Sequence, residues 1–358
     1  DTHWFTSKTM AFMMPTIMMI MNGLSLAIYW IGAVLINDAQ DMQEKFTLFS
    51  DMVVFSSYAM QVVMSFMMLV MIFIMLPRAS VAAKRILEVL DTEPSIEDGT
   101  RDTFPVMKDG EVEFKDVSFK YPDAEEYVLE HISFSAKKGE TIAFIGATGC
   151  GKSTAINLIP RFYDATEGEV FVDGVNVKEY TQEALHNKIG YVSQKAILFS
   201  GTIADNVAYG ENGKAPATQD DIAMAVKVAQ ASEFVEKKDQ GYDGYVAQGG
   251  SNFSGGQKQR LSIARAIARQ PEILIFDDSF SALDYKTDRI LREALRKECK
   301  DATKIIVAQR IGTIRDADKI IVLDDGQIAG MGTHDELMKN CEVYQEIAYS
   351  QLSKEELA

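Results

Sequence analysis

Two long apolar runs without a charged residue lie near the start of the chain and limit the folds open to it. They cover residues 11–36 and 52–76 of the 358-residue sequence. Each exceeds the ~20 apolar residues that a helix needs to cross a bilayer. A pair of buried core helices is the alternative, and the length of the charge-free runs disfavours it. We predict two membrane-spanning helices within a partial transmembrane domain over residues 1–76.

The charges that flank these runs predict an orientation in the membrane. Residues 37–51, which we expect to form the loop between the runs, carry four acidic side chains and one lysine. Basic side chains follow the second run, at Arg78, Lys84 and Arg85. Because basic residues mark the cytosolic side of a membrane helix, residues 37–51 should lie outside and everything after Leu76 in the cytosol. We therefore expect a multi-pass protein of the cell membrane with a cytoplasmic domain.

Charge and cysteine usage exclude some classes of function. The net charge of −16 argues against nucleic acid as the main partner, because phosphate backbones attract Lys and Arg. The three cysteines, Cys150, Cys299 and Cys341, are odd in number and widely spaced. This pattern predicts neither a disulfide framework nor a metal cluster, and it fits a reducing cytosol.

The rest of the chain has the pattern of an α/β domain. We expect residues 77–110 to form a cytosolic helix extension that ends at Pro94, followed by a linker that contains Pro and Gly. Residues 111–121 alternate with period two, which is typical of a half-buried strand. Short apolar runs and a mostly helix-like stretch over residues 202–269 follow. Over residues 111–358 we predict a mixed sheet core with an antiparallel β region and a helical subdomain.

A phosphate-binding loop is the first chemical motif in this domain. The segment "GATGCGKST" follows an apolar run and precedes an expected helix, as the G-x-x-x-x-G-K-[ST] pattern requires. Glycines let the backbone N–H groups face phosphates, and the helix start adds its dipole. Lys152 should pair with the β and γ phosphates of ATP, and Ser153 should bind Mg²⁺. The candidate nucleotide ligands in this loop are Gly146, Thr148, Gly149, Cys150, Gly151, Lys152, Ser153 and Thr154.

A carboxylate at the end of a second apolar run complements this loop. The segment "EILIFDD" ends in Asp277 and Asp278. A carboxylate at the end of a buried strand can hold the Mg²⁺ of a bound nucleotide. We predict that Asp277 has this role together with Ser153. The predicted family is that of the phosphate-loop ATPases.

The segment "NFSGGQKQR" makes the prediction more specific, because it resembles the signature of ATP-binding cassette (ABC) transporters. The resemblance covers the whole chain, and the apolar helices look like the last two of six spans in an exporter half-transporter. It implies that Tyr121 stacks on adenine and that Gln194 contacts Mg²⁺ and faces the membrane domain. It also implies that the signature residues contact the ATP of a partner subunit, and that a short loop crosses to the opposite site. The signature residues are Phe253, Ser254, Gly255, Gly256 and Gln257, and the crossing loop (D-loop) is Ser281, Ala282, Leu283 and Asp284.

The signature also has a physical reason to bind phosphate. Ser254 and the amides of Gly255 and Gly256 precede a helical run, so they should form an anion site at a helix start. One bound nucleotide does not need both the phosphate loop and the signature of the same chain. The resemblance implies head-to-tail pairing, in which each ATP lies between the phosphate loop of one subunit and the signature of the other.

Two residues depart from the pattern of active family members. Asp278 stands where they have the catalytic Glu, and Gln309 stands where they usually have the switch His. The shorter Asp would misplace the carboxylate, and catalysis depends steeply on position. Glutamine donates hydrogen bonds but cannot become cationic. Harmless variation is the alternative, but both changes fall on one hydrolytic pocket. The chain thus resembles the degenerate-site subunit of bacterial heterodimeric multidrug exporters.

The cargo is predicted less directly. Of the 18 methionines, 14 lie in residues 1–76, and flexible Met side chains suit several apolar ligands. We expect a hydrophobic small-molecule cargo, although packing against lipid and neighbouring helices also explains the methionines. Two rival functions stay open: a homodimeric lipid or peptide exporter, and a non-pumping ATP-gated regulatory or channel subunit.

Overall fold

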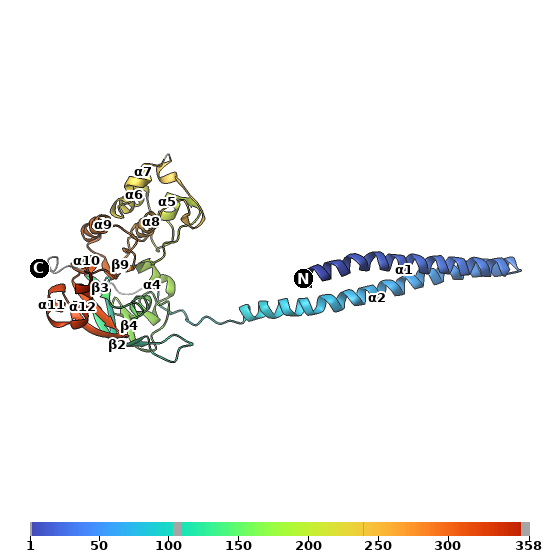
Figure 1. Cartoon of the computed structure of the whole chain (residues 1–358), viewed down its shortest axis with the longest axis horizontal. Helices are drawn as coiled ribbons and strands as arrows, with labels where there is room; N and C mark the ends of the chain where they lie inside the picture. The colour runs from blue at the N-terminus through green and yellow to red at the C-terminus, as the bar shows by residue number, and fades with distance from the viewer. Residues whose placement is uncertain (1, 103–108, 239, 352–358) are drawn as a thin grey trace. The chain divides into compact units, whose positions relative to one another are not determined.

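The structure, a computed structural model, describes residues 2–102, 109–238 and 240–351. The chain divides into two compact units, Asp1–Ser95 and Ile96–Ala358. In its described part the first unit consists of two helices and short connecting segments, and the second contains the strands. Figure 1 shows both units, coloured along the chain.

The first unit is a hairpin of two long helices, α1 (Thr2–Asp38) and α2 (Met42–Leu90). Both predicted helices are thereby confirmed, and both are long and apolar enough to cross a membrane. No residue of α2 is buried within the chain, so its apolar side chains are free for lipid or for other helices. In Figure 1 the two helices run side by side from a tight connection.

The connection between these helices is shorter than the sequence suggested. We expected a loop over residues 37–51, but α2 already begins at Met42, which leaves residues 39–41. Asp41 at the N-cap and Glu44 three residues later match a common helix-start pattern in sequence, although the Asp41 side chain makes no capping bond. At its other end α2 continues through Pro77 to Leu90. The expected helix extension is therefore part of the second span's own helix, and the membrane boundary at Leu76 stays a prediction.

Part of the segment that we assigned to a linker is held by the second unit. The Gly99 N–H donates to the Tyr180 carbonyl at 3.0 Å, and the Asp98 carboxylate accepts from the Gln182 N–H at 2.6 Å. Arg101 pairs with Glu179 at 3.1 Å. The chain that follows α2 thus lies along the start of α4 (Gln182–Lys188). Residues 103–108 of the expected linker lie outside the described part.

A six-stranded sheet forms the centre of the second unit. Neighbouring strands are parallel from β11 through β3, β10 and β9 to β6, and β12 alone runs antiparallel at its edge. Alternate residues of β3 join separate core clusters, because the sheet is covered on both faces. In sheet order the strands are β12 (Gln327–Gly332), β11 (Lys319–Asp324), β3 (Thr141–Ile145), β10 (Thr303–Val307), β9 (Ile273–Asp277) and β6 (Ile189–Val192).

An antiparallel sheet packs beside it, as the alternating pattern after residue 111 predicted. Its inward residues include Val112, Phe114 and Val117, which are buried. Its strands, in sheet order, are β2 (Leu129–Ala136), β1 (Val112–Phe119), β4 (Glu167–Val172) and β5 (Val175–Asn176). A small pair, β7 (Gly201–Thr202) and β8 (Tyr245–Val246), lies in the helical part.

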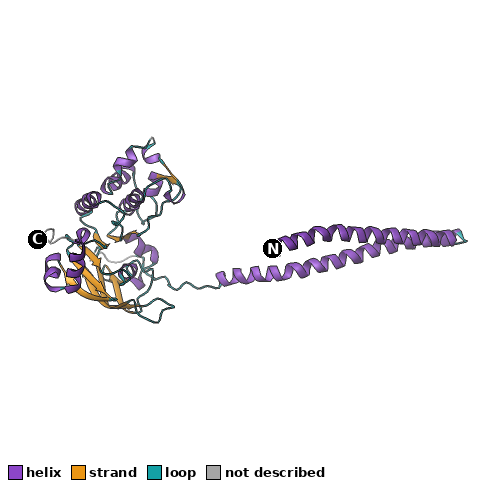
Figure 2. Ribbon diagram, viewed as in Figure 1, coloured by secondary structure: helices purple, strands orange, loops and turns teal. Residues whose placement is uncertain are grey.

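Helices α5 to α8 lie together as a helical subdomain, which packs on the six-stranded sheet through α8 (Figures 1 and 2). Capping boxes begin α5, α6 and α8, which fixes where these helices start. The subdomain consists of α5 (Ile203–Val207), α6 (Gln219–Val228), α7 (Ser232–Glu236) and α8 (Gly255–Ala268). The other helices are α3 (Lys152–Asn157), α9 (Tyr285–Glu298), α10 (Ile311–Ile314), α11 (His334–Asn340) and α12 (Glu342–Gln351).

The topology decides where a ligand site can form. The chain reverses after the carboxyl ends of β3, β6, β9 and β10, and in open α/β sheets ligands bind at this edge. The phosphate loop follows β3, Gln194 follows β6, Asp278 follows β9 and Gln309 follows β10. Candidate residues from four distant parts of the sequence therefore meet at one edge.

Candidate nucleotide-binding site

The phosphate loop (residues 146–154) connects β3 to α3 through a backbone that only glycine allows. A Cβ atom at Gly146 would collide with the Leu323 carbonyl oxygen. Gly149 and Gly151 have φ angles of 92° and 95°, in the left-handed region that side chains disfavour. Gly151 is also the N-cap of α3. The sequence pattern thus produces a tight turn whose N–H groups precede a helix start.

The ammonium group of Lys152 lies folded over this loop. Its Nζ donates to the carbonyl oxygens of Gly146 at 2.9 Å and Ala147 at 2.7 Å. The side chain is buried, with 8% of its surface exposed. A fixed positive charge beside a turn of backbone amides is suited to bind phosphate oxygens.

A hydroxyl and a carboxylate meet directly behind the loop. The Ser153 Oγ donates to Asp277 Oδ1 at 2.7 Å, and Asp277 is the last residue of the buried strand β9. Oxygen ligands of this kind suit Mg²⁺, so the donor set fits the predicted metal. Three or more clustered His, Cys, Asp or Glu side chains, as a transition metal would need, do not occur among the described residues. The predicted Mg²⁺ site consists of Ser153, Asp277 and Gln194 with the oxygens of a bound nucleotide, and it stays a prediction.

Tyr191 supports this pair, and the sequence interpretation missed it. Its hydroxyl donates to Asn157 Oδ1 at 2.9 Å and lies 3.4 Å from Asp277 Oδ2. Burial raises the pKa of the Tyr191 phenol, so it stays a neutral donor toward the carboxylate. The clue in the sequence was its position on the strand that leads to Gln194.

Asp278, Gln194 and Gln309 form a hydrogen-bonded group beside the loop. The Gln309 Nε2 donates to Asp278 Oδ2 at 2.8 Å, and the Gln194 Nε2 reaches the same oxygen at 3.3 Å. All three residues line a hollow of about 200 Å³ with Lys152 and Ser153. The structure thus brings together the residues that the sequence assigned to metal binding, water activation and the switch position.

The carboxylate of Asp278 is held in a constrained place. Its backbone has a φ angle of 44°, in the left-handed region, and its side chain is 7% exposed. Burial raises the pKa of this carboxyl, because it disfavours the charged form. The question is whether its short side chain reaches an attacking water.

Tyr121, the expected adenine contact, lies at the edge of the phosphate loop. Its hydroxyl is 3.1 Å from the Thr154 hydroxyl. Its ring packs edge-on against Phe119 and Tyr163, with centroid distances of 5.0 and 5.2 Å. The ring is partly exposed. Its place beside the loop suits a stacking surface for a base, and that role stays a prediction.

The signature residues form a helix start that is separate from the hollow around Lys152. Ser254 is the N-cap of α8, and its side chain accepts from the Gln257 N–H at 3.3 Å. A Cβ at Gly255 would meet nothing within 4 Å, so this helix start faces open space. Phe253 is buried below it. None of these residues is among those that line the phosphate hollow.

Comparison with known proteins agrees with this arrangement. The family model described as ABC transporter matches residues 129–281, from the antiparallel sheet to the D-loop. The chain carries an ABC transporter nucleotide-binding domain. The predicted fold class is confirmed, including the two long apolar helices of an exporter-type membrane domain before the ABC domain.

Several ABC transporter proteins are similar to the chain. An uncharacterized ABC transporter ATP-binding protein of Mycobacterium bovis is 44% identical over 95% of this chain and 57% of its own length. A putative multidrug export ATP-binding/permease protein of Staphylococcus aureus is 44% identical over 73% of this chain and 45% of its own length. The solved structure of a bacterial Atm1-family ABC exporter with ATP bound has a TM-score of 0.75 at 33% identity, covering 85% of this chain and 53% of that one. The chain spans a little over half the length of the curated relatives it matches most extensively.

The D-loop of the ABC domain is fixed by its own polar side chains. The Ser281 Oγ donates to the Asp278 carbonyl at 2.8 Å. Asp284 caps α9 by accepting from the Thr287 N–H at 3.0 Å, and this bond lowers the pKa of its carboxyl. Leu283 is buried, and the Ala282 carbonyl lies near Gly256 at the start of the signature helix. The D-loop thus connects Asp278 to the signature within one chain.

Gln259 makes a second connection that the sequence interpretation missed. It is 2% exposed on α8, and its Nε2 donates to the Ser193 carbonyl at 3.2 Å. Ser193 precedes Gln194. A polar residue on the buried side of a predicted helix was the available signal, because buried amides need a partner.

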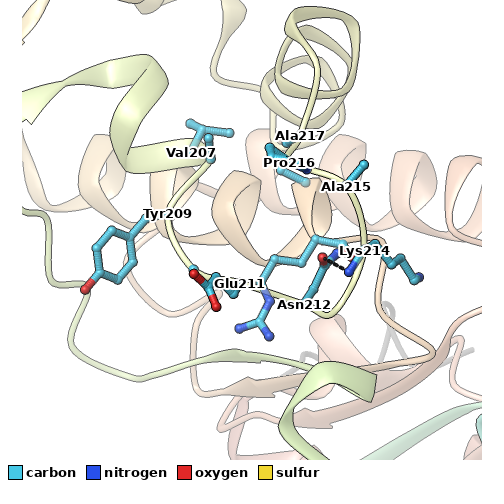
Figure 3. A pocket seen from close by; sticks show the side chains of 12 residues that line it. Val207, Tyr209, Glu211, Asn212, Lys214, Ala215, Pro216 and Ala217 are labelled. Atoms are coloured by element: carbon cyan, nitrogen blue, oxygen red, sulfur yellow. Dashed lines mark hydrogen bonds between the residues drawn. The ribbon is translucent and has the colours of Figure 1, made fainter. Parts of the chain in front are cut away.

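A second and larger hollow lies in the helical subdomain, away from the phosphate loop (Figure 3). It has a volume of about 470 Å³. It is lined by residues 207–212 and 214–217 together with Ala268 and Arg269. The Asn212 side chain accepts from the Lys214 N–H at 3.0 Å, as Figure 3 shows. None of the residues predicted to contact nucleotide lines this hollow.

Proposed function

We propose that the chain is one half of an ABC exporter that uses ATP and Mg²⁺ to move hydrophobic or amphipathic compounds across the cell membrane. The proposal places the helical hairpin in the bilayer and the ABC domain in the cytoplasm. Its support is the similarity to exporters over both units of the chain, together with the charge distribution around the apolar helices. Residues Lys152, Ser153 and Asp277 would hold the nucleotide and its metal. Mg²⁺ supplies charge neutralisation on the phosphates when it is bound.

We further propose that this chain's own site binds ATP but hydrolyses it slowly. The observation that carries this is the 2.8 Å bond from Gln309 Nε2 to Asp278 Oδ2. One of the two carboxylate oxygens, Oδ2, accepts from the neutral Gln309 amide, and the Gln194 Nε2 lies 3.3 Å from the same oxygen. An attacking water competes with these donors for a carboxylate that is one methylene shorter than Glu. Neither amide can supply the positive charge that a protonated histidine would place near the γ-phosphate.

The partner in this proposal is a second, different half-transporter with Glu and His at these two places. The exposed start of α8 supports it, because Ser254 and Gly255 present a helix N-terminus that no group of this chain's own phosphate hollow uses. The signature would bind the γ-phosphate of ATP held by the partner. The partner's site would then provide most of the hydrolysis that resets the dimer.

The proposed cargo is inferred from the exposed side chains of the two apolar helices. The exposed side chains of α1 and α2 include many Met residues, which are flexible and polarizable. Such a surface accommodates varied apolar ligands, and one similar protein is a putative multidrug exporter. We therefore propose multidrug-type cargo. Transport assays with dyes, lipids and peptides separate this from the lipid and peptide alternatives.

The double variant Asp278→Glu with Gln309→His tests the slow site. We expect ATP turnover of the assembled membrane complex to rise by about tenfold or more at this subunit's site, because a tenfold rate change needs only ~1.4 kcal/mol of barrier. Hydrolysis is measured in a complex whose partner carries a Glu→Gln change at its own catalytic carboxylate. The matched control, Asp324→Glu with Gln327→His, makes the same chemical changes at an exposed turn. Turnover equal to that of the control contradicts the slow site.

Purification from native membranes tests the heterodimer. We expect a second, unlike half-transporter to be recovered with this chain in equal amounts. Recovery of a single polypeptide species that transports contradicts the unlike partner and supports the homodimer. Binding of ATP without any transport of dyes, lipids or peptides supports the regulatory or channel function instead.

A further inference from the structure

The C-terminal helix α12 is anchored firmly to the ABC domain. Tyr344 and Ala348 are fully buried, and the Tyr344 hydroxyl is 2.8 Å from His334 Nδ1. Positions 344, 348 and 351 are spaced by four and three residues, so they lie on one face of the helix. The anchoring of the first two residues therefore directs Gln351 toward the domain.

Gln351 uses both ends of its side-chain amide on one short piece of backbone. Its Oε1 accepts from the Ile311 N–H at 2.9 Å, and its Nε2 donates to the Gln309 carbonyl at 2.7 Å. These two bonds span the switch loop, which we define as residues 309–311. The side chain thus pairs with the loop much as a neighbouring strand would.

The switch loop needs such a partner. Ile311 begins the short helix α10, and the N-cap residue Arg310 provides no side-chain cap. The first N–H groups of a helix have no partner inside it, so one must come from elsewhere. Arg310 instead reaches toward the D-loop, to the carbonyls of Ser281 and Leu283 at 3.4 and 3.5 Å. Gln351 supplies the missing acceptor from a helix 40 residues further along the chain.

We propose that Gln351 is a positioning residue for Gln309, and that α12 sets the place of the switch side chain at the nucleotide site. The loop carries Gln309, whose side chain ends on Asp278 at 2.8 Å. Fixing the carbonyl of Gln309 and the N–H of Ile311 fixes the backbone from which this side chain extends. The inference rests on the proposed place of Gln309 at the γ-phosphate. It holds whether the site turns ATP over slowly or quickly.

We call the two hydrogen bonds from Gln351 to the switch loop the clamp. Substitutions of Gln351 can remove both bonds or only one. Gln351→Ala removes both. Gln351→Glu keeps an acceptor for the Ile311 N–H but loses the donor to Gln309 and places a carboxylate beside its carbonyl. Gln345→Ala is the matched control, because Gln345 lies on the same helix and donates to Met338 rather than to the switch loop.

The measurement is the retention of nucleotide by this subunit in the complete membrane complex. The complex is loaded with 8-azido-ATP and Mg²⁺, freed of excess nucleotide, and irradiated after increasing delays. Label on this chain then reports its own site. We expect Gln351→Ala and Gln351→Glu to shorten the retention half-life by about 2- to 10-fold, the size of one lost neutral hydrogen bond. Gln345→Ala should leave the half-life unchanged.

A double variant distinguishes positioning from a general loss of stability. In a Gln309→Ala background the further change Gln351→Ala should have no added effect, because both remove the same contact. An additive effect, or a wild-type half-life in Gln351→Glu, overturns the clamp. If Gln309→Ala shortens retention and Gln351→Ala does not, the clamp alone is wrong. If Gln309→Ala itself has no effect, the clamp is wrong and the proposed place of Gln309 at the nucleotide fails with it.

Discussion

The two sides of the phosphate hollow differ in the kind of group that they present. On one side Lys152, Ser153 and Asp277 offer a cation, a hydroxyl and a carboxylate, each fixed by the phosphate loop or by the end of β9. On the other side Asp278 and Gln309 bond to each other through a neutral amide. We call the first the holding side, because its groups are the ones proposed to bind the nucleotide. We call the second the cleaving side. There the Asp278 and Gln309 side chains hydrogen-bond to each other.

This difference shows how Lys152, Ser153 and Asp277 can stay in place when Asp278 or Gln309 is substituted. Lys152 and Ser153 come from the segment between β3 and α3 and Asp277 ends β9, whereas Asp278 and Gln309 follow β9 and β10. Substitutions on the second group leave the glycine turn and the Ser153–Asp277 bond in place. A subunit can thus lose hydrolysis and keep ATP as a structural ligand that joins a dimer.

The largest effect should follow the loss of the cation on the holding side. Lys152→Ala removes a charge-assisted contact to phosphate, so ATP affinity should fall on the order of 10- to 100-fold. Titration with a fluorescent ATP analogue measures it, with Lys178→Ala as the control at an exposed position. Unchanged affinity in Lys152→Ala would remove the basis of the comparison. A melting curve checks that the variant is folded.

A smaller effect should follow the loss of the metal carboxylate. Asp277→Asn keeps a hydrogen-bond acceptor for Ser153 but removes the charge that attracts Mg²⁺. We expect about tenfold weaker ATP binding with Mg²⁺ present, because hydrogen bonds to charged groups contribute roughly 1.5–3 kcal/mol. With EDTA the variant and the wild type should bind ATP equally. Asp324→Asn serves as the control, and a loss of affinity that persists in EDTA contradicts the metal role.

The smallest effect should appear on the cleaving side as a change in stability with pH. Burial raises the pKa of Asp278 in the folded chain, so ionisation of this carboxyl costs more in the folded state than in the unfolded state. That penalty is absent below the pKa of the unfolded state. It increases as the pH rises from the unfolded pKa to the folded pKa, and it is complete above the folded pKa. Asp278→Asn keeps an acceptor for Gln309 without the charge. It should therefore melt slightly above wild type at pH 7, with a difference that shrinks toward about pH 4.

ATP affinity provides the contrast for this last variant. Because Asp278 lies on the cleaving side, Asp278→Asn should bind ATP as tightly as wild type, within about twofold. A melting difference that grows toward acid pH contradicts the sign of the pKa shift. A large loss of ATP affinity shows that the two sides are not separable.

Some features of the molecule were predictable from short stretches of sequence. The phosphate loop, the strand before it and the two apolar helices each depend on spacing within about 40 residues, and local sequence fixes such patterns. The hairpin turn at Asp325 and Gly326 was equally local, and both residues have positive φ angles. Prediction from local sequence was wrong where the same residues suit either a loop or a helix end. The start of α2 at Met42 is an example, because charged residues suit a helix end as well as a loop.

What the sequence alone determined is the set of chemical groups: a glycine-rich phosphate loop, two adjacent aspartates at the end of an apolar run, and the side chains of Gln194 and Gln309. Only the tertiary structure decided which of these groups meet. Gln194 and Asp278 are 84 residues apart, and they touch because β6 pairs with β9. Gln309 reaches Asp278 because β10 lies on the other side of β9. Strand order depends on the packing of the whole sheet, and no local pattern of residues records it.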